Sequence, residues 1–328
     1  MLGALFAVLS ALSFAFSTIT ARRGVIGSSA SFGLYITVIL GVPLFAIAAL
    51  ATGQLFDTLD LSSEALGMLA GAGVLHFLIG RYCNYRCIDA IGSNRSQPLQ
   101  TTNTIYSVVI AVIVLNEEVT LLMGVGIALL VVGPMIMVER RRQQQPEPVA
   151  ARASTQPAAP PQPSGASSPD AARPRRNAAT DPSYVEGYTF GLLSAAAYGT
   201  SPIMIRYALE DTGLGIAGGL VAYVAAAGVL ILALAIPGRV QDLRGFSLKV
   251  VPMFAASAVA VFLAQLFRFA ALAIAPVSLV TPLARLGVVF VPTLSFVFNR
   301  NLESFSLRVL TGIALSGLGA VLLALGIT

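Results

Sequence analysis

Two pairs of polar residues stand inside long apolar segments, and each pair combines an arginine with a side-chain amide. Arg81 and Asn84 lie three residues apart, as do Gln265 and Arg268. On a helix this spacing places both members of a pair on one face. Ionisable groups are costly to bury in a membrane span, so they are the first candidates for a functional site. Because arginine forms forked hydrogen bonds with carboxylate and phosphate groups, the pattern predicts binding of an anion.

A third arginine, Arg285, follows Thr281 by about one helical turn in another apolar segment. Residues 93–115 are polar along much of their length and add further hydrogen-bonding groups. We predict a substrate site formed by Arg81, Asn84, Gln97, Asn103, Tyr106, Gln265, Arg268, Thr281 and Arg285. Arginines can instead reach the membrane interface or cap a helix end, and Arg86 and Arg206 fit that interpretation.

No carboxylate stands in the middle of an apolar segment, which favours an external anion as the partner of the arginines. Glu117 and Glu303 stand at segment ends, where a capping role is expected. His76 could titrate near neutral pH and couple transport to protons, although a lone histidine in an apolar helix is more often hydrogen-bonded packing. Facilitated exchange of anions needs no titrating group and fits this pattern best.

Other classes of protein find little support in the sequence. It holds no Ser/His/Asp set, no metal-binding cluster and no GxxxxGK[ST] loop, so we expect no enzyme, no cofactor and no direct use of ATP. Cys83 and Cys87 lie four residues apart and are interpreted as packing residues. The net charge of +5 comes without interleaved aromatic residues, so nucleic acid is not an expected partner.

The elements that must position these side chains are membrane helices. The chain is 56% hydrophobic and only 11% charged, whereas a soluble domain carries about 25% charged residues. Lipid must therefore surround most of it, and we expect a multi-pass protein of a bacterial inner membrane. Continuous apolar runs without alternation predict an all-α fold rather than a barrel. Ten segments are long enough to span: 2–20, 31–52, 66–88, 93–115, 119–138, 187–207, 215–236, 251–274, 277–298 and 305–327.

A segment of different composition divides the chain into two similar halves. Residues 139–183 hold nine of the 18 prolines and seven arginines, which predicts a disordered linker between repeats 1–138 and 184–328. Gln97-Pro98-Leu99 aligns with Thr281-Pro282-Leu283, and further matches follow, including Gly126 with Gly312. Five helices per half would invert the second repeat, an arrangement that permits alternating access. Pro98 and Pro282 are expected to interrupt the fourth and ninth helices and to serve in gating.

The distribution of charged residues predicts an orientation in the membrane. By parity, Arg22, Arg23 and the linker arginines lie on one side, whereas Asp57, Asp60 and Glu64 lie on the other. The positive-inside rule then places both termini outside and the linker in the cytoplasm.

With its two halves, its paired prolines and a glutamate after each proline-bearing segment, the chain resembles the ten-helix EamA-type branch of the drug/metabolite transporter superfamily. It departs from the family where Asn116-Glu117 and Asn301-Leu302-Glu303 replace a Gly-Glu step. The resemblance implies a transporter and leaves the substrate open. It also implies cytoplasmic termini, opposite to the charge pattern.

A carrier of a small organic anion or phosphorylated metabolite fits the arginines best. An exporter of neutral amino acids or drugs with structural arginines, and a flippase for a lipid-linked phosphate, are the alternatives. The oligomeric state stays open.

Overall fold

A computed structural model describes residues 2–24, 30–91, 93–137, 184–210, 212–234, 251–298 and 307–326, so the predicted linker 139–183 lies outside the described residues. All regular structure within these ranges is helical, which confirms the predicted all-α class. The elements are α1 (Leu2–Gly24), α2 (Ala30–Ala51), α3 (Gln54–Asp57), η1 (Thr58–Asp60), α4 (Ser63–Gly73), η2 (Val74–Gly80), α5 (Arg81–Ile91), α6 (Ser93–Val114), α7 (Leu121–Met137), α8 (Tyr184–Leu209), α9 (Gly215–Leu234), α10 (Val251–Ile274), α11 (Val277–Ala284), α12 (Gly287–Phe298) and α13 (Leu307–Leu325).

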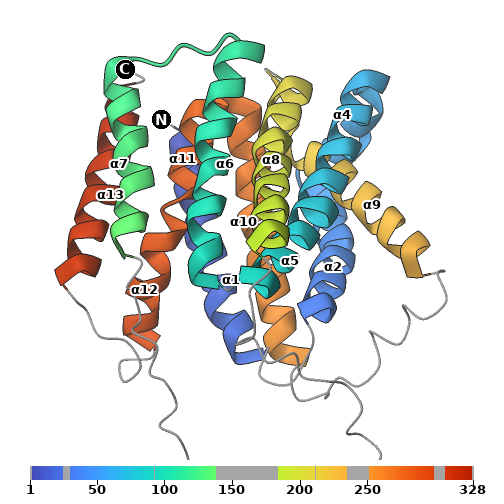
Figure 1. Ribbon diagram of the computed structural model, residues 1–328. Helices are drawn as coiled ribbons and strands as arrows, with labels where there is room; N and C mark the ends of the chain where they lie inside the picture. The colour runs from blue at the N-terminus through green and yellow to red at the C-terminus, as the bar shows by residue number, and fades with distance from the viewer. Residues whose placement is uncertain are drawn as a thin grey trace, which may run out of the picture.

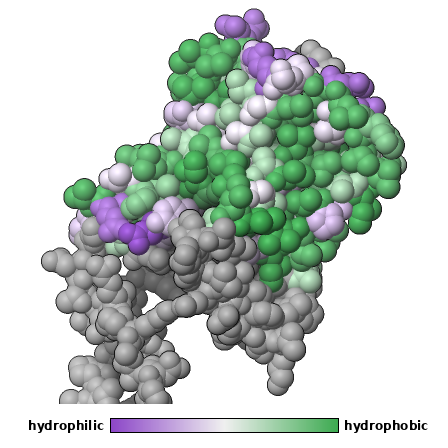
Figure 2. Space-filling model, turned by 90° about the vertical axis from the view of Figure 1, so that its right-hand side faces the viewer, coloured by the Kyte–Doolittle hydropathy of each residue, from purple (hydrophilic) through white to green (hydrophobic). Residues whose placement is uncertain are grey.

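The helices stand side by side in one bundle, with α7 and α13 at one edge and α9 at the other (Figure 1). Large apolar side chains such as Ile47, Leu121 and Leu232 are exposed on the outside of the bundle. Figure 2 shows hydrophobic residues over most of the described surface of one face, with polar residues gathered towards its ends. This distribution suits a bundle surrounded by lipid.

By length and hydropathy, three described segments can each span a membrane: Ser63–Cys87, Gly215–Ala233 and Ala255–Ile274. A bent pair, Tyr35–Ala51 with Gln54–Asp60, makes a fourth if it is counted as one span. Other described helices are apolar but shorter. The number of ten spans therefore stays a prediction.

Small residues bring the repeats into close contact where α7 packs on α13. A Cβ atom added to Gly126 would lie 2.8 Å from the carbonyl oxygen of Gly319, and one added to Gly133 would lie 2.2 Å from the Ser316 hydroxyl oxygen. Rising residue numbers on α7 meet falling numbers on α13, so the two helices are antiparallel. This close contact through small residues is intramolecular.

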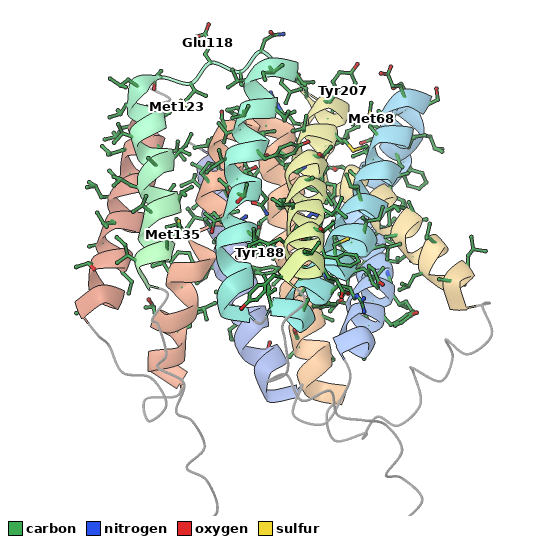
Figure 3. The ribbon with its side chains drawn as sticks, in the orientation of Figure 1. Met68, Glu118, Met123, Met135, Tyr188 and Tyr207 are labelled. Carbon is green, nitrogen blue, oxygen red and sulfur yellow. The ribbon has the colours of Figure 1, made fainter. Side chains whose placement is uncertain are left out.

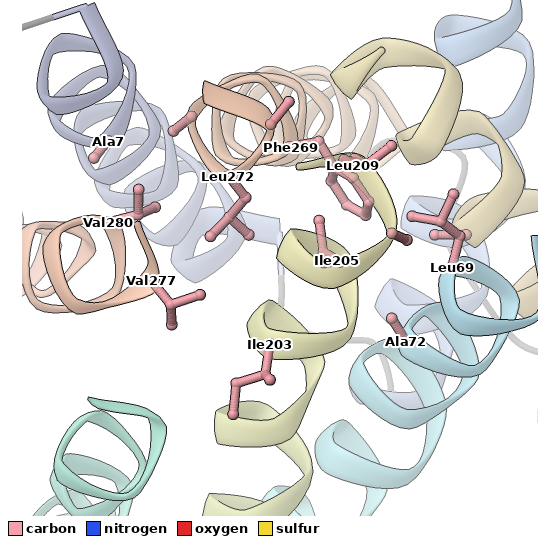
Figure 4. Close-up of a cluster of buried hydrophobic side chains, with 14 of the residues drawn as sticks. Ala7, Leu69, Ala72, Ile203, Ile205, Leu209, Phe269, Leu272, Val277 and Val280 are labelled. Atoms are coloured by element: carbon pink, nitrogen blue, oxygen red, sulfur yellow. The ribbon is translucent and has the colours of Figure 1, made fainter. Parts of the chain in front are cut away.

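The centre of the bundle is apolar on the side of α4, α8, α10 and α11. Figure 4 shows side chains from these helices and from α1 pointing towards one another. The members include the fully buried Leu69, Leu209, Phe269, Leu272 and Val277. This packing holds α8 against α10, the two helices that carry Tyr198 and Arg268.

Pro282 lies inside α11, and the helix breaks after it, whereas no break occurs at Pro98; the gating role of both prolines stays a prediction. The ninth predicted segment is interrupted: α11 ends at Ala284, and α12 begins at Gly287 after a turn at Arg285 and Leu286. In contrast, α6 is continuous across Pro98. Pro98 lies in the second turn of α6, so it removes a single hydrogen bond close to the helix start, where the strain is least.

Candidate functional site

A π-helix occupies the middle of the third predicted segment. Residues Val74–Gly80 form this wider helix between α4 and α5, so the backbone hydrogen bonds there connect residues five apart. His76 lies within it, and Arg81, five residues later, is its C-cap. The wider turn brings these two side chains towards one face, whereas a regular α-helix would point them in well-separated directions. Single π-helical turns are frequent at functional sites.

Arg268 on α10 reaches His76 across the bundle. Its Nη1 atom lies 3.1 Å from Nε2 and 3.4 Å from Nδ1 of the imidazole. The His76 ring also stands edge-on to Tyr198 of α8, with ring centroids 4.8 Å apart. The π-helix, α8 and α10, which lie far apart in the sequence, therefore meet at His76.

Arg81 completes what we call the central cluster, formed by His76, Arg81, Tyr198 and Arg268. Its Nη1 donates to the Thr37 hydroxyl of α2 over 3.2 Å, and the Tyr198 hydroxyl lies beside its guanidinium. The charges of Arg81 and Arg268 both act on His76. Both arginines are half-buried as residues, on helices that pack inside the bundle. The structure thus places two of the predicted site arginines near one histidine.

Arg285 is placed differently, at the break between α11 and α12. Its Nε donates to the Thr104 hydroxyl over 2.7 Å, and its Nη2 donates to the Gln100 carbonyl over 2.7 Å and to the Asn103 side-chain oxygen. It lies close enough to Arg268 for the two positive charges to repel. Arg285 therefore fastens the broken ninth segment to α6 while it extends the positive field of the central cluster.

The remaining predicted site residues divide into three groups. Tyr106 bonds to Thr200 of α8 over 3.1 Å, and Thr281 bonds to Ser107 of α6 over 3.5 Å, so both join α6 to its neighbours. Gln265 and Asn84 share a face with Arg268 and Arg81, and their side-chain oxygens are buried without a hydrogen-bond partner. The side chains of Gln97 and Pro98 lie outside those that the structure describes.

Within the described residues, the ion pairs lie away from the central cluster. Arg86 pairs with Glu186 of α8. Arg206 pairs with Glu210 over 2.9 Å and donates to the carbonyls of Leu272 and Ala273 at the end of α10. Of the two roles expected for Arg206, at the membrane interface or as a helix cap, the structure shows the helix cap. No carboxylate of the described chain pairs with Arg81, Arg268 or Arg285.

Glu117 holds the beginning of the broken ninth segment. Its two carboxylate oxygens accept hydrogen bonds from the backbone N–H groups of Val277 and Ser278, at 2.7 and 2.8 Å. These groups open α11, whose N-cap residue Pro276 offers no side-chain acceptor. The predicted capping role of Glu117 is confirmed, although the helix that it caps belongs to the other repeat. Glu303 lies outside the described residues.

Sequence reasoning missed Thr37, Tyr198 and the contact between His76 and Arg268. Tyr198 stands among Ala, Gly and Ser residues in the sixth segment, and its hydroxyl could have marked it as polar. Thr37 gives no such signal, since threonine is common in membrane helices.

Comparison with known proteins agrees with this architecture. A family model described as the EamA-like transporter family matches residues 1–138 and 185–325. A search of curated proteins gave no match. A solved structure, titled only as the crystal structure of a protein, aligns over 98% of this chain and 97% of its own, with a TM-score of 0.68 and 14% identity. That likeness supports the fold alone. Because the family model covers both halves, the chain belongs to the EamA-like transporter family, whose members are multi-pass membrane transporters of the drug/metabolite transporter type.

Proposed function

We propose that this protein is a secondary transporter of a small organic anion or phosphorylated metabolite. It binds the anion at the central cluster and moves it by alternating access of its two repeats, in a bacterial inner membrane. The single observation that carries this proposal is that Arg81 and Arg268 both lie near His76 and that neither has a carboxylate partner in the described chain.

The free energy of buried charge supports an anionic substrate. A guanidinium removed from water without a counter-charge costs several kcal/mol, roughly, even when it is hydrogen-bonded. In the described structure, Arg81 and Arg268 bond to neutral groups, namely a threonine and a histidine. A carboxylate or phosphate between them would supply the missing negative charge and accept forked hydrogen bonds.

The side-chain oxygens of Gln265 and Asn84, which have no hydrogen-bond donor, further restrict which functional groups the substrate should carry. Gln265 is only 3% exposed, and its Oε1 atom has no donor. A buried acceptor without a donor costs about 1–3 kcal/mol, which a donor on the substrate would remove. The preferred substrate on this reasoning carries a hydroxyl or amine group beside its anionic group.

Alternating access is supported by the broken ninth segment. Discontinuous helices near the interface of inverted repeats commonly form the substrate sites of secondary transporters. Here the break carries Arg285, whose bonds to α6 join the two repeats at this level. A change in those bonds would let α12 move relative to α6 while Glu117 still holds α11.

A second candidate is an exporter of neutral amino acids or drugs in which the arginines are structural. The extensive bonding of Arg285 to Gln100, Asn103 and Thr104 favours it, because those bonds resemble a helix clamp more than a binding site. The described hydrogen bonds of Arg81 and Arg268 are fewer than those of Arg285, so we rank the anion transporter first.

Transport in proteoliposomes tests the proposal. Vesicles are loaded with carboxylates, sugar phosphates, amino acids or cationic drugs, and the loss of each compound is compared with that from protein-free vesicles. We expect an anion to leave the vesicles. Its rate of efflux should fall about 10- to 150-fold in Arg268→Gln, because a charge-assisted hydrogen bond of about 1.5–3 kcal/mol disappears. Arg86→Gln, outside the cluster, is the control and retains transport. Loss of neutral or cationic compounds that persists in Arg268→Gln would reject the anion and favour the second candidate.

A further inference from the structure

The proposed function leaves one titratable group of the central cluster without a role. His76 is the single histidine of the chain; it contacts Arg268, and the charge of Arg81 also acts on it. We propose that His76 is a proton-binding site that fills together with the anion site, so that the transporter moves a proton and its anion in the same direction. This inference rests on the proposed function, because it requires an anion at the central cluster.

The contact with Arg268 sets the charge of His76 in the empty protein. Nη1 of Arg268 lies within 3.4 Å of both ring nitrogens, and a guanidinium only donates hydrogen bonds, so this contact favours a ring nitrogen that keeps its lone pair. An imidazolium has no free nitrogen lone pair with which to accept. Protonation would also place a third positive charge beside two arginines. The empty site therefore holds His76 neutral.

The groups that surround His76 from other elements do not offset this positive field. Tyr198 of α8 contacts the ring edge-on, and Tyr223 of α9 packs on the neighbouring Phe77 with centroids 4.4 Å apart. Both tyrosines are neutral phenols near neutral pH. On α10 the neighbour is the cationic Arg268, and the hydroxyl groups of Thr37 on α2 and Tyr85 on α5 lie near Arg81. None of these described groups carries a negative charge.

A bound anion would reverse the charge balance around His76 and favour its protonated form. When a carboxylate or phosphate binds Arg268, its N–H groups turn to the anion, and the negative charge offsets both guanidinium groups. The imidazole then takes up a proton from the aqueous solution, keeps it, and donates a hydrogen bond from the new N–H group to the anion. By linkage, a bound anion raises the affinity of His76 for the proton by the same factor by which the bound proton raises the affinity of the site for the anion. Anion affinity thus rises as pH falls, by up to about tenfold per pH unit for one coupled proton.

The single histidine makes a direct test possible. Protein with ¹³C- and ¹⁵N-labelled histidine, in lipid nanodiscs, gives one imidazole signal that reports the protonated fraction by NMR. At about pH 6.5, close to the midpoint of free histidine, Arg268→Gln without added anion should increase the imidazolium fraction relative to wild type. Sodium sulfate, compared with sodium chloride at equal ionic strength, should increase that fraction in wild type. An unchanged fraction in Arg268→Gln would overturn the proposal, because Arg268 would then not control the proton.

A binding measurement separates this inference from the proposed function. Sulfate keeps its charge from about pH 6 to about pH 8. Any pH dependence of the stability that sulfate adds to the wild-type protein therefore reports protonation of the protein. His76→Gln keeps an acceptor for Arg268 but cannot take a proton, and its sulfate affinity should not depend on pH. Sulfate affinity that is pH-independent in wild type would overturn the proton site and leave the anion transporter standing. If sulfate, carboxylates and phosphates all fail to stabilise wild type, both proposals fail.

Discussion

Glu117 offers the sharpest test of how the broken ninth segment is held. The Glu117→Gln substitution keeps the length of the side chain but leaves one carbonyl oxygen for two backbone donors, Val277 N–H and Ser278 N–H. One donor of the pair then loses its acceptor at a helix start where Pro276 provides no side-chain cap. A lost hydrogen bond to a charged group contributes about 1.5–3 kcal/mol, and the lost attraction to the helix dipole adds about 0.3–1 kcal/mol. We expect a loss of about 2–4 kcal/mol in the free energy of unfolding.

The neighbouring residue supplies a matched control for this substitution. Glu118 is exposed in the connection between α6 and α7, at the end of the bundle where Tyr207 also lies (Figure 3). Glu118→Gln removes the same charge from the same loop without touching α11, and it should change the free energy of unfolding by less than about 0.5 kcal/mol. Unfolding of both variants is followed by circular dichroism as denaturing detergent is added to mixed micelles. Equal stability of the two variants would refute the capping role of Glu117.

Three further predictions follow from the packing. Gly126→Ala should destabilise the protein by about 1–3 kcal/mol in the same unfolding assay, because its Cβ atom would meet the α13 backbone at 2.8 Å, whereas Gly124→Ala on the same helix has open space and should be neutral or stabilising. Arg206→Gln should lower stability by about 1–3 kcal/mol by uncapping α10 yet leave anion transport in place, and a loss of anion specificity would contradict its capping role. Cys83 and Cys87 are buried free thiols, so a maleimide should label them only after unfolding, and rapid labelling of the folded protein would show that this face of α5 is open.

Helical spacing was enough to predict the pairs Arg81 with Asn84 and Gln265 with Arg268, because residues three apart share a helix face whatever surrounds them. It could not show that Arg81 and Arg268 would both lie near His76. The position of His76 relative to Arg81 follows from the π-helix, which has no distinct signature in the mostly apolar residues Val74–Gly80. The inserted residue of a π-helix is stabilised by tertiary contacts, so sequence periodicity alone does not reveal it.

The role of Arg285 shows a second limit. Its place one turn after Thr281 suggested a substrate ligand, but its described hydrogen bonds go to α6, almost two hundred residues earlier in the chain. Only the packing of α11 against α6 brings those acceptors within reach. Glu117 was more predictable, since a carboxylate at a segment end commonly meets a helix N-terminus, but the identity of that helix again depended on tertiary structure.

Thermal unfolding of the detergent-purified protein against carboxylates, sugar phosphates, amino acids and cationic drugs tests the central claim most directly, because a ligand that binds the folded state raises the Tm. We predict that an anion raises the Tm of wild type and of Arg86→Gln, and that Arg268→Gln loses this stabilisation. Stabilisation by neutral or cationic compounds alone, retained in Arg268→Gln, would contradict an anion site at the central cluster.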